Sequence, residues 1–320
     1  MAHTSLAIIS HDLGNYEKAL SEFSEAQRLE PNSVLSYALL GLSYQFLNRF
    51  DEADAVYKQA DDRKLESELL FGNRYELAFL KGDAAVMELF ASGAMGKPGI
   101  EDYLLAEQSD TQAWYAKMKN ARELTRRAMD SAEHNDAKES AASYQAASAL
   151  REVEIGNREE ARAGANAALK LAPNREVRTM AALALARAGD TAEAEKLATE
   201  LDKEFPLDTL VQRYWLPTIR AAIALEGTNP NRAVENLKET SVIELGGHNV
   251  FVSLVPVYVR GEAYLAWPTV APQQQNFRNS LTIAGRWPTF LGAHWPAWDS
   301  PAPTPCKATP PKPEPITRIS

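Results

Sequence analysis

A repeat of 34 residues constrains this chain more than any other feature. The segments 13–32, "LGNYEKALSEFSEAQRLEPN", and 47–66, "LNRFDEADAVYKQADDRKLE", carry matching residue types at matching positions. The pairs 34 positions apart are Tyr16 and Phe50, Ala19 and Ala53, Phe23 and Tyr57, and Ala26 and Ala60. A fixed period of this length predicts one supersecondary unit that stacks on its copies, because a single unit cannot bury its apolar face alone.

The residue types within the period predict a helix, a tight turn and a second helix. Gly14 and Asn48 stand at the turns, where a left-handed backbone is often needed. Gly41 and Ala53 are small and let paired helices approach closely, while Tyr57 fills the space beside them. This pattern resembles the tetratricopeptide repeat. The resemblance implies an all-α fold, a right-handed superhelical solenoid of antiparallel helix pairs.

The pattern recurs with decay along the chain, and its fourth unit lacks a glycine at the turn. We predict a solenoid domain over residues 1–266, of about seven and a half units. An irregular all-α bundle is the alternative. Beyond the first two units, the recurrences are the segments 75–91, 112–132, 148–174, 181–206, 214–238 and the half unit 255–266.

Residues 267–320 break the helical pattern and are rich in Pro and Trp. They predict a non-regular, disordered tail. A shifted reading frame near Leu265–Pro272 is the other interpretation, because codons for residues 273–285 can be chosen to read "AAEFQKLLDHRG", a plausible second helix. Either way the last unit lacks its second helix and leaves apolar surface near Tyr264, so the solenoid ends could self-associate.

Charge and composition limit the partners and the compartment. The net charge of −9 and pI of about 5.3 argue against nucleic acid, whose binding needs a basic face. The single cysteine, Cys306, cannot form an internal disulfide. The sequence has no signal peptide and no apolar run of membrane-spanning length. We therefore expect a cytoplasmic protein that does not enter a membrane.

No catalytic, cofactor or metal motif is present in the sequence. None of the five histidines lies three or four residues from another histidine or from the cysteine, so zinc spacing is missing. Carboxylate pairs such as Glu159 and Glu160 stand at the starts of second helices, where the helix dipole favours negative charge. We expect a chain that is not an enzyme and holds no cofactor. An unrecognised groove hydrolase would need two acidic residues across a deep pocket with perturbed pKa values.

The resemblance implies a scaffold whose first helices line a concave groove for a peptide or a partner helix. A clamp for a C-terminal carboxylate is disfavoured because Ile8, Ala38 and Leu42 occupy the matching positions. A mostly apolar groove suits a helix or an apolar peptide. The groove residues predicted are Ile8, Asp12, Leu42, Gln45, Phe46, Glu76, Phe79, Leu150, Glu154, Leu183 and Arg187.

A narrower resemblance concerns the segments 75–87, 96–115 and 214–225. They look like the C-terminal repeat region of large bacterial proteins that join a serine/threonine kinase, or a winged-helix domain, to such arrays. This resemblance implies the sensor or docking part of a bacterial signalling protein.

Overall fold

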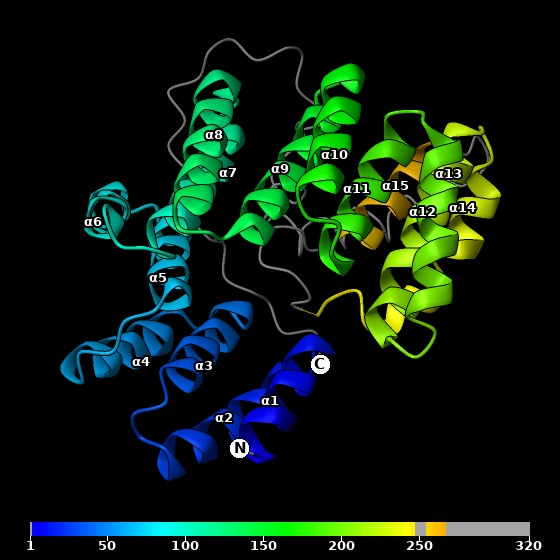
Figure 1. Ribbon diagram of the computed structural model, residues 1–320. Helices are drawn as coiled ribbons and strands as arrows, with labels where there is room; N and C mark the ends of the chain where they lie inside the picture. Colours follow the sequence, from blue (N-terminus) through cyan, green and yellow to red (C-terminus); the bar gives the residue numbers. More distant parts are fainter. Residues whose placement is uncertain (1, 247–253, 267–320) are drawn as a thin grey trace.

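A computed structural model describes residues 2–246 and 254–266 of the chain, and every regular element in these ranges is helical (Figure 1). The helices follow one another in short-linked pairs. Two short segments interrupt the α-helices, a π-helix at Val211–Trp215 and a 3-10 helix at Glu239–Val242. The α-helices are α1 (Ala2–Asp12), α2 (Tyr16–Leu29), α3 (Val34–Phe46), α4 (Phe50–Asp62), α5 (Glu68–Lys81), α6 (Ala84–Ala94), α7 (Glu101–Trp114), α8 (Met118–His134), α9 (Lys138–Glu154), α10 (Arg158–Leu171), α11 (Arg175–Arg187), α12 (Thr191–Glu204), α13 (Leu216–Glu226), α14 (Pro230–Asn236) and α15 (Val255–Leu265).

The prediction of an all-α solenoid of antiparallel helix pairs is confirmed. Each odd-numbered helix packs against the even-numbered helix that follows it, and odd-numbered helices also pack against one another from unit to unit. The array curves strongly. The odd-numbered helices α3, α5, α9 and α11 lie toward its inside, and α4, α6, α10 and α12 toward its outside (Figure 1).

The turns inside the helix pairs share one backbone conformation. A residue with a positive φ stands at intervals of 34 residues in the first four units, at Gly14, Asn48, Gly82 and Ala116. Ala116, with a φ of 58°, occupies the turn that lacks a glycine in the sequence. This turn therefore keeps the left-handed backbone although glycine, the residue favoured there, is absent. The later pairs turn at Gly156, Gly189 and Thr228.

Small residues set the distance between paired helices. A Cβ atom built on Gly41 would lie 2.2 Å from the ring of Tyr57, so only glycine fits at this crossing of α3 and α4. The Tyr57 ring is buried, and Gln45 fixes it by donating an amide hydrogen bond of 2.6 Å to its hydroxyl. The predicted close approach at Gly41 is therefore confirmed.

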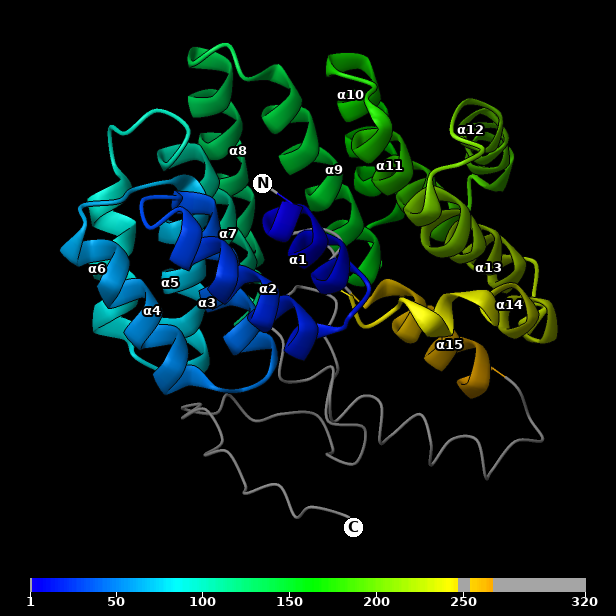
Figure 2. The same cartoon turned by 90° about the horizontal axis from the view of Figure 1, so that it is seen from below.

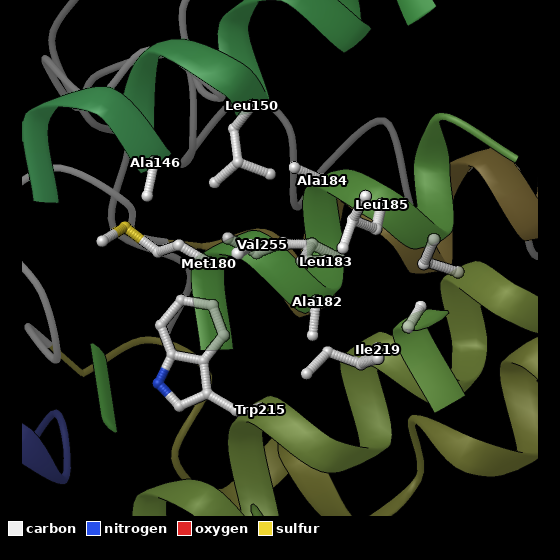
Figure 3. Close-up of a cluster of buried hydrophobic side chains, with 14 of the residues drawn as sticks. Ala146, Leu150, Met180, Ala182, Leu183, Ala184, Leu185, Trp215, Ile219 and Val255 are labelled. Atoms are coloured by element: carbon white, nitrogen blue, oxygen red, sulfur yellow. The ribbon is translucent and has the colours of Figure 1, made fainter. Parts of the chain in front are cut away.

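The largest hydrophobic cluster surrounds α11. Leu150 of α9, Met180 and Leu183 of α11, and Trp215 and Ile219 of the next unit converge in it (Figure 3). Every residue from Thr179 to Ala186 is buried, so α11 is enclosed on all sides. Alanines make up half of this stretch, and their small side chains let the neighbouring helices close around it.

The first repeat meets the segment that follows α14. The hydroxyl of Tyr16 donates a hydrogen bond to the backbone carbonyl of Leu245, and Leu13 packs against the cluster around α11. A Cβ atom built on Gly14 would lie 3.5 Å from the backbone of Leu245 and Gly246. Both views show the turn after α1 beside the segment that follows α14 (Figures 1 and 2). The solenoid therefore closes on itself.

The last described helix, α15, stands where the half unit 255–266 is predicted. The tail at 267–320 and its shifted reading frame lie outside the described residues, so both stay predictions.

Candidate functional site

A cavity of about 380 Å³ lies at the C-terminal ends of α9, α11 and α13, beside α15. Its apolar surface comes from small and aliphatic residues, and its charged surface from two arginines and three glutamates. The lining residues are Val153, Glu154, Gly156, Arg158, Arg187, Ala222, Leu225, Glu226, Tyr258, Glu262 and Ala266.

Arg187 ties three helices together in this cavity. Its Nη1 donates to Glu262 Oε2 of α15 at 2.6 Å, and its Nη2 donates to Glu154 Oε2 of α9 at 3.0 Å. The hydroxyl of Tyr258 donates to the same Glu154 oxygen at 2.5 Å. Arg187 Nε and Glu154 Oε1 are 2.8 Å apart, a charge contact without the alignment of a hydrogen bond. The four side chains form one network.

Burial makes this network strongly interdependent. Only 2% of the Glu154 side chain and 12% of the Arg187 side chain are exposed. Burial raises the pKa of Glu154, and the charge of Arg187 opposes that change. Burial alone would lower the pKa of Arg187, but Glu154 and Glu262 outweigh it and the pKa lies well above its ordinary value. Removing Arg187 would leave Glu154 buried without its counter-ion.

A second ion pair lines the same cavity. Arg158 binds the carboxylate of Glu226 through both Nη atoms, each at 2.9 Å. About half of the Arg158 side chain is exposed, so this pair stands nearer to solvent than the network of Arg187. The cavity contains three carboxylates and two guanidinium groups, and its formal charge is negative.

Acidic side chains also gather where α5 meets α7. Asp110 of α7 raises the pKa of Glu76 of α5, and both of them raise the pKa of Glu107 of α7. The hydroxyl of Tyr75 donates to Thr111 Oγ1 at 2.9 Å and holds the two helices together here. One arginine of α9 faces the group. This residue is Arg151. Its Nη1 donates to Asp110 Oδ1 at 2.7 Å and to Ser109 Oγ at 2.6 Å, and its Nη2 donates to Thr125 Oγ1 at 2.5 Å.

Burial in the acidic group favours the protonated, neutral form of its glutamates. Glu107 is 6% exposed, and its carboxyl lies beside the side chain of Tyr103. Burial, followed by the nearby charges of Glu76 and Asp110, raises the pKa of Glu107 well above its ordinary value. Burial and Asp110 also raise the pKa of Glu76 to about 8.

Three predicted groove residues belong to these two places, and a fourth, Phe79, lies elsewhere on α5. Glu154 and Arg187 meet in the cavity, as given above. Glu76 belongs to the acidic group, and Phe79, one turn further along α5, packs edge-on against Trp114. Two of the predicted residues, on different helices, are therefore in direct contact.

Three predicted groove residues are buried in the packing between helices instead. Leu150 and Leu183 lie in the cluster around α11, and Leu183 is fully buried. Gln45 donates to Tyr57 and to the backbone carbonyl of Asn73. Their assignment to the groove is corrected, because the solenoid curves tightly enough to cover these helices on more than one side.

The remaining predicted groove residues are half-buried and lie on the first two odd-numbered helices. Ile8 and Asp12 belong to α1, and Leu42 and Phe46 belong to α3. The Phe46 ring packs against His11 at 4.9 Å and against Tyr16 at 4.8 Å between ring centroids. Phe46 therefore supports the contact between the two ends of the array.

Sequence reasoning missed Glu107, Asp110, Tyr258 and Glu262. The two acidic residues of α7 stand three positions apart and so share a helix face. That spacing could have indicated the acidic group, whereas the contact of Tyr258 with Glu154 spans 104 positions and leaves no local signal.

The described residues contain neither a metal-binding cluster nor a membrane-spanning helix. No cluster of three or more His, Cys, Asp or Glu side chains within 2–246 and 254–266 is arranged to hold a metal ion. No helix in these ranges is long and apolar enough to cross a membrane.

Comparison with known proteins supports the repeat interpretation at the N-terminus. The tetratricopeptide repeat family model matches residues 2–33 and 34–66. A search of curated proteins gives no match. Among solved structures, a tetratricopeptide repeat protein from Parabacteroides merdae is similar, with 17% identity over 89% of this chain and 90% of that chain, and a TM-score of 0.34. Yeast Tom70 is similar with 14% identity over 89% of this chain and 76% of that chain, and a TM-score of 0.36. Residues 2–33 and 34–66, which form the first units of this solenoid, are thus similar to tetratricopeptide repeats.

Proposed function

We propose that this chain is a non-enzymatic scaffold that binds a peptide or a helix of a partner protein along the inward side of its odd-numbered helices. Tetratricopeptide repeats commonly mediate contacts between proteins. The observation that carries the proposal is the cavity at the ends of α9, α11 and α13, beside α15. It lies where four odd-numbered elements come together and is not filled by the hydrophobic core.

The cavity has the size and the lining of a side-chain pocket. Its volume of about 380 Å³ lies at the lower end of the range typical of ligand sites. Val153, Ala222 and Leu225 supply apolar surface, and Arg158 and Glu262 supply exposed charge. A partner side chain with an apolar stem and a polar end matches this combination. The aromatic pair of Phe79 and Trp114 offers a second apolar contact on α5 and α7.

Photo-crosslinking in the cells that encode the chain tests the proposal. The photoreactive residue p-benzoylphenylalanine would replace Phe79 in one variant and Glu195, exposed on the outer helix α12, in a control. We expect a protein adduct that depends on the Phe79 position, with the crosslink mapped to one peptide. Equal adducts at both positions, or adducts at Glu195 alone, would contradict binding on the inward side.

The narrower proposal is that the scaffold serves as the sensor or docking part of a bacterial signalling protein in the cytoplasm. The segments that look like kinase-linked arrays support it. The identity of the crosslinked partner tests it, because a protein with no link to signalling would remove that support.

A further inference from the structure

The hydrophobic core is not continuous around the ring. One buried cluster joins α1 to α5 and contains Phe23, Tyr37 and Tyr57, and a separate cluster joins the end of α7 to α15 and contains Met180. Between them, the third and fourth units hold two smaller clusters of their own. The array therefore consists of two well-packed arms, here called the first arm (α1–α4) and the second arm (α9–α15), and of a middle part with less core.

The middle part is packed most loosely at α6. Only Ala91 and Ala94 of this helix are buried, and Leu89 is 66% exposed. The loop that leads from α6 to α7 contains Gly96 and Gly99, both with a positive φ, and a Cβ atom built on either glycine would touch nothing within 4 Å. A helix with few buried contacts and a loop with open space around its glycines resist bending little, and these are the properties of a hinge.

The two arms also meet directly, at positions far apart in the chain (Figures 1 and 2). Tyr16 of the first arm donates its hydrogen bond to the backbone carbonyl of Leu245 in the second arm, and Leu13 packs against the cluster of the second arm. A neutral hydrogen bond between protein groups replaces bonds to water, so its net contribution to stability is small. This contact can therefore break while the cores of both arms stay intact.

We infer that the array is a hinged clamp. Its hinge is α6 with the loop that follows, and its latch is the contact of Leu13 and Tyr16 with the second arm at Leu245 and Gly246. While the latch holds, the ring is closed and only a free chain end can thread into it. When the latch opens, an internal segment of a partner can enter from the side. This last step rests on the proposed function, whereas the hinge and the latch belong to this chain alone and are tested without a partner.

Electron paramagnetic resonance distances between two nitroxide spin labels across the latch test the clamp. Cys306→Ser removes the one native thiol, and labels are attached at Ser21→Cys on α2 and Glu235→Cys on α14, two exposed positions. The reference pair is Glu195→Cys with Glu235→Cys, which lies within the second arm and should keep a single distance. Thermal melting establishes that each labelled protein folds.

Tyr16→Phe weakens the latch by removing its hydrogen bond, and Tyr115→Phe is the control because Tyr115 is an exposed tyrosine outside the latch. We expect a short and a long distance across the latch, for the closed and the open ring. The ratio of open to closed should be about fivefold higher in Tyr16→Phe, the factor that corresponds to one neutral hydrogen bond. A single distance in all variants, or equal ratios in Tyr16→Phe and Tyr115→Phe, would overturn the latch.

Hydrogen exchange of the backbone amides tests the hinge. The amides of α6 should exchange at least about tenfold faster than those of α4 and α8, the outer helices on either side, because α6 has fewer buried contacts. Equal exchange in α6 and α8 would overturn the hinge. Photo-crosslinking at Phe79 reports on the partner instead, so its failure would overturn the proposed function and leave the clamp intact.

Discussion

The hydroxyl of Tyr16, at the start of α2, donates a hydrogen bond to the backbone carbonyl of Leu245, 229 positions later in the chain. Tyr16 is 8% exposed, and its ring packs against His11 and Phe46. Burial raises the pKa of the phenol, so it stays protonated and able to donate. One residue therefore joins the first repeat to the last described units.

Replacing Tyr16 with Phe tests the energetic weight of that contact. The ring packing remains, but the carbonyl of Leu245 loses its donor. We expect the free energy of unfolding to fall by about 1 kcal/mol, measured by urea denaturation. The control is Tyr115→Phe, because Tyr115 is an exposed tyrosine. Equal stability of Tyr16→Phe and wild type would show that the ends are not held by this bond.

Gly41→Ala should overpack the crossing of α3 and α4. The new Cβ would lie 2.2 Å from the buried Tyr57 ring, which Gln45 holds in place. We expect a loss of about 1–3 kcal/mol in thermal or urea unfolding. Gly93→Ala is the matched control, since its Cβ meets only Phe71 at 3.6 Å, an ordinary contact. The control should retain its stability or gain up to about 1 kcal/mol. A Gly41→Ala protein as stable as the control would refute the packing.

Arg187→Ala should be the most damaging of the charge removals. It leaves Glu154 buried without a counter-ion and separates α9, α11 and α15 at one point. We expect a loss of about 3–5 kcal/mol in urea unfolding. Arg126→Ala, which removes an exposed partner of Glu123 and Asp130 on one helix, should cost about 0–1 kcal/mol. Similar losses in the two variants would argue against the network.

Glu76 should make stability depend on pH. Its pKa rises from 4.5 to about 8 on folding, through burial and Asp110, with Glu107, Tyr57 and Tyr103 also facing it. Folding therefore favours the protonated carboxyl, and this contribution is lost as pH rises from about 4.5 to about 8. The stability of E76Q relative to wild type should increase across that interval and then level off. Urea unfolding at a series of pH values measures the difference, and a flat difference would contradict the raised pKa.

Ala116→Gly should stabilise the chain. Ala116 holds a φ of 58°, a conformation that costs an ordinary residue about 1–2 kcal/mol and glycine almost nothing. We expect a gain of about 1 kcal/mol in thermal unfolding. Gly156→Ala is the converse, because its φ is 85° and an added Cβ would touch nothing within 4 Å. A loss of similar size there would isolate the backbone effect, whereas stability unchanged in both would refute it.

The sequence predicts the parts of this fold that repeat locally. The 34-residue period places the helix pairs, and Gly41 shows where two helices approach most closely. It cannot predict how far the solenoid curves, because that depends on many small packing angles. Leu183 was therefore expected on an open face and is fully buried, and Tyr258 meets Glu154 across 104 positions. The candidate site is formed by the curvature of the solenoid, so the sequence predicted only some of its residues.

The evenly spaced left-handed turns divide the array, and the coding sequence behind it, into exchangeable units of equal length. Because Gly14, Asn48, Gly82 and Ala116 share one backbone conformation at equal intervals, a block that begins and ends at such residues can be duplicated or deleted without disturbing the phase of its neighbours. Recombination between repeated coding segments would then change the length of the scaffold in whole units. The side chains between the turns would be free to diverge, as they do between the first unit and the fourth.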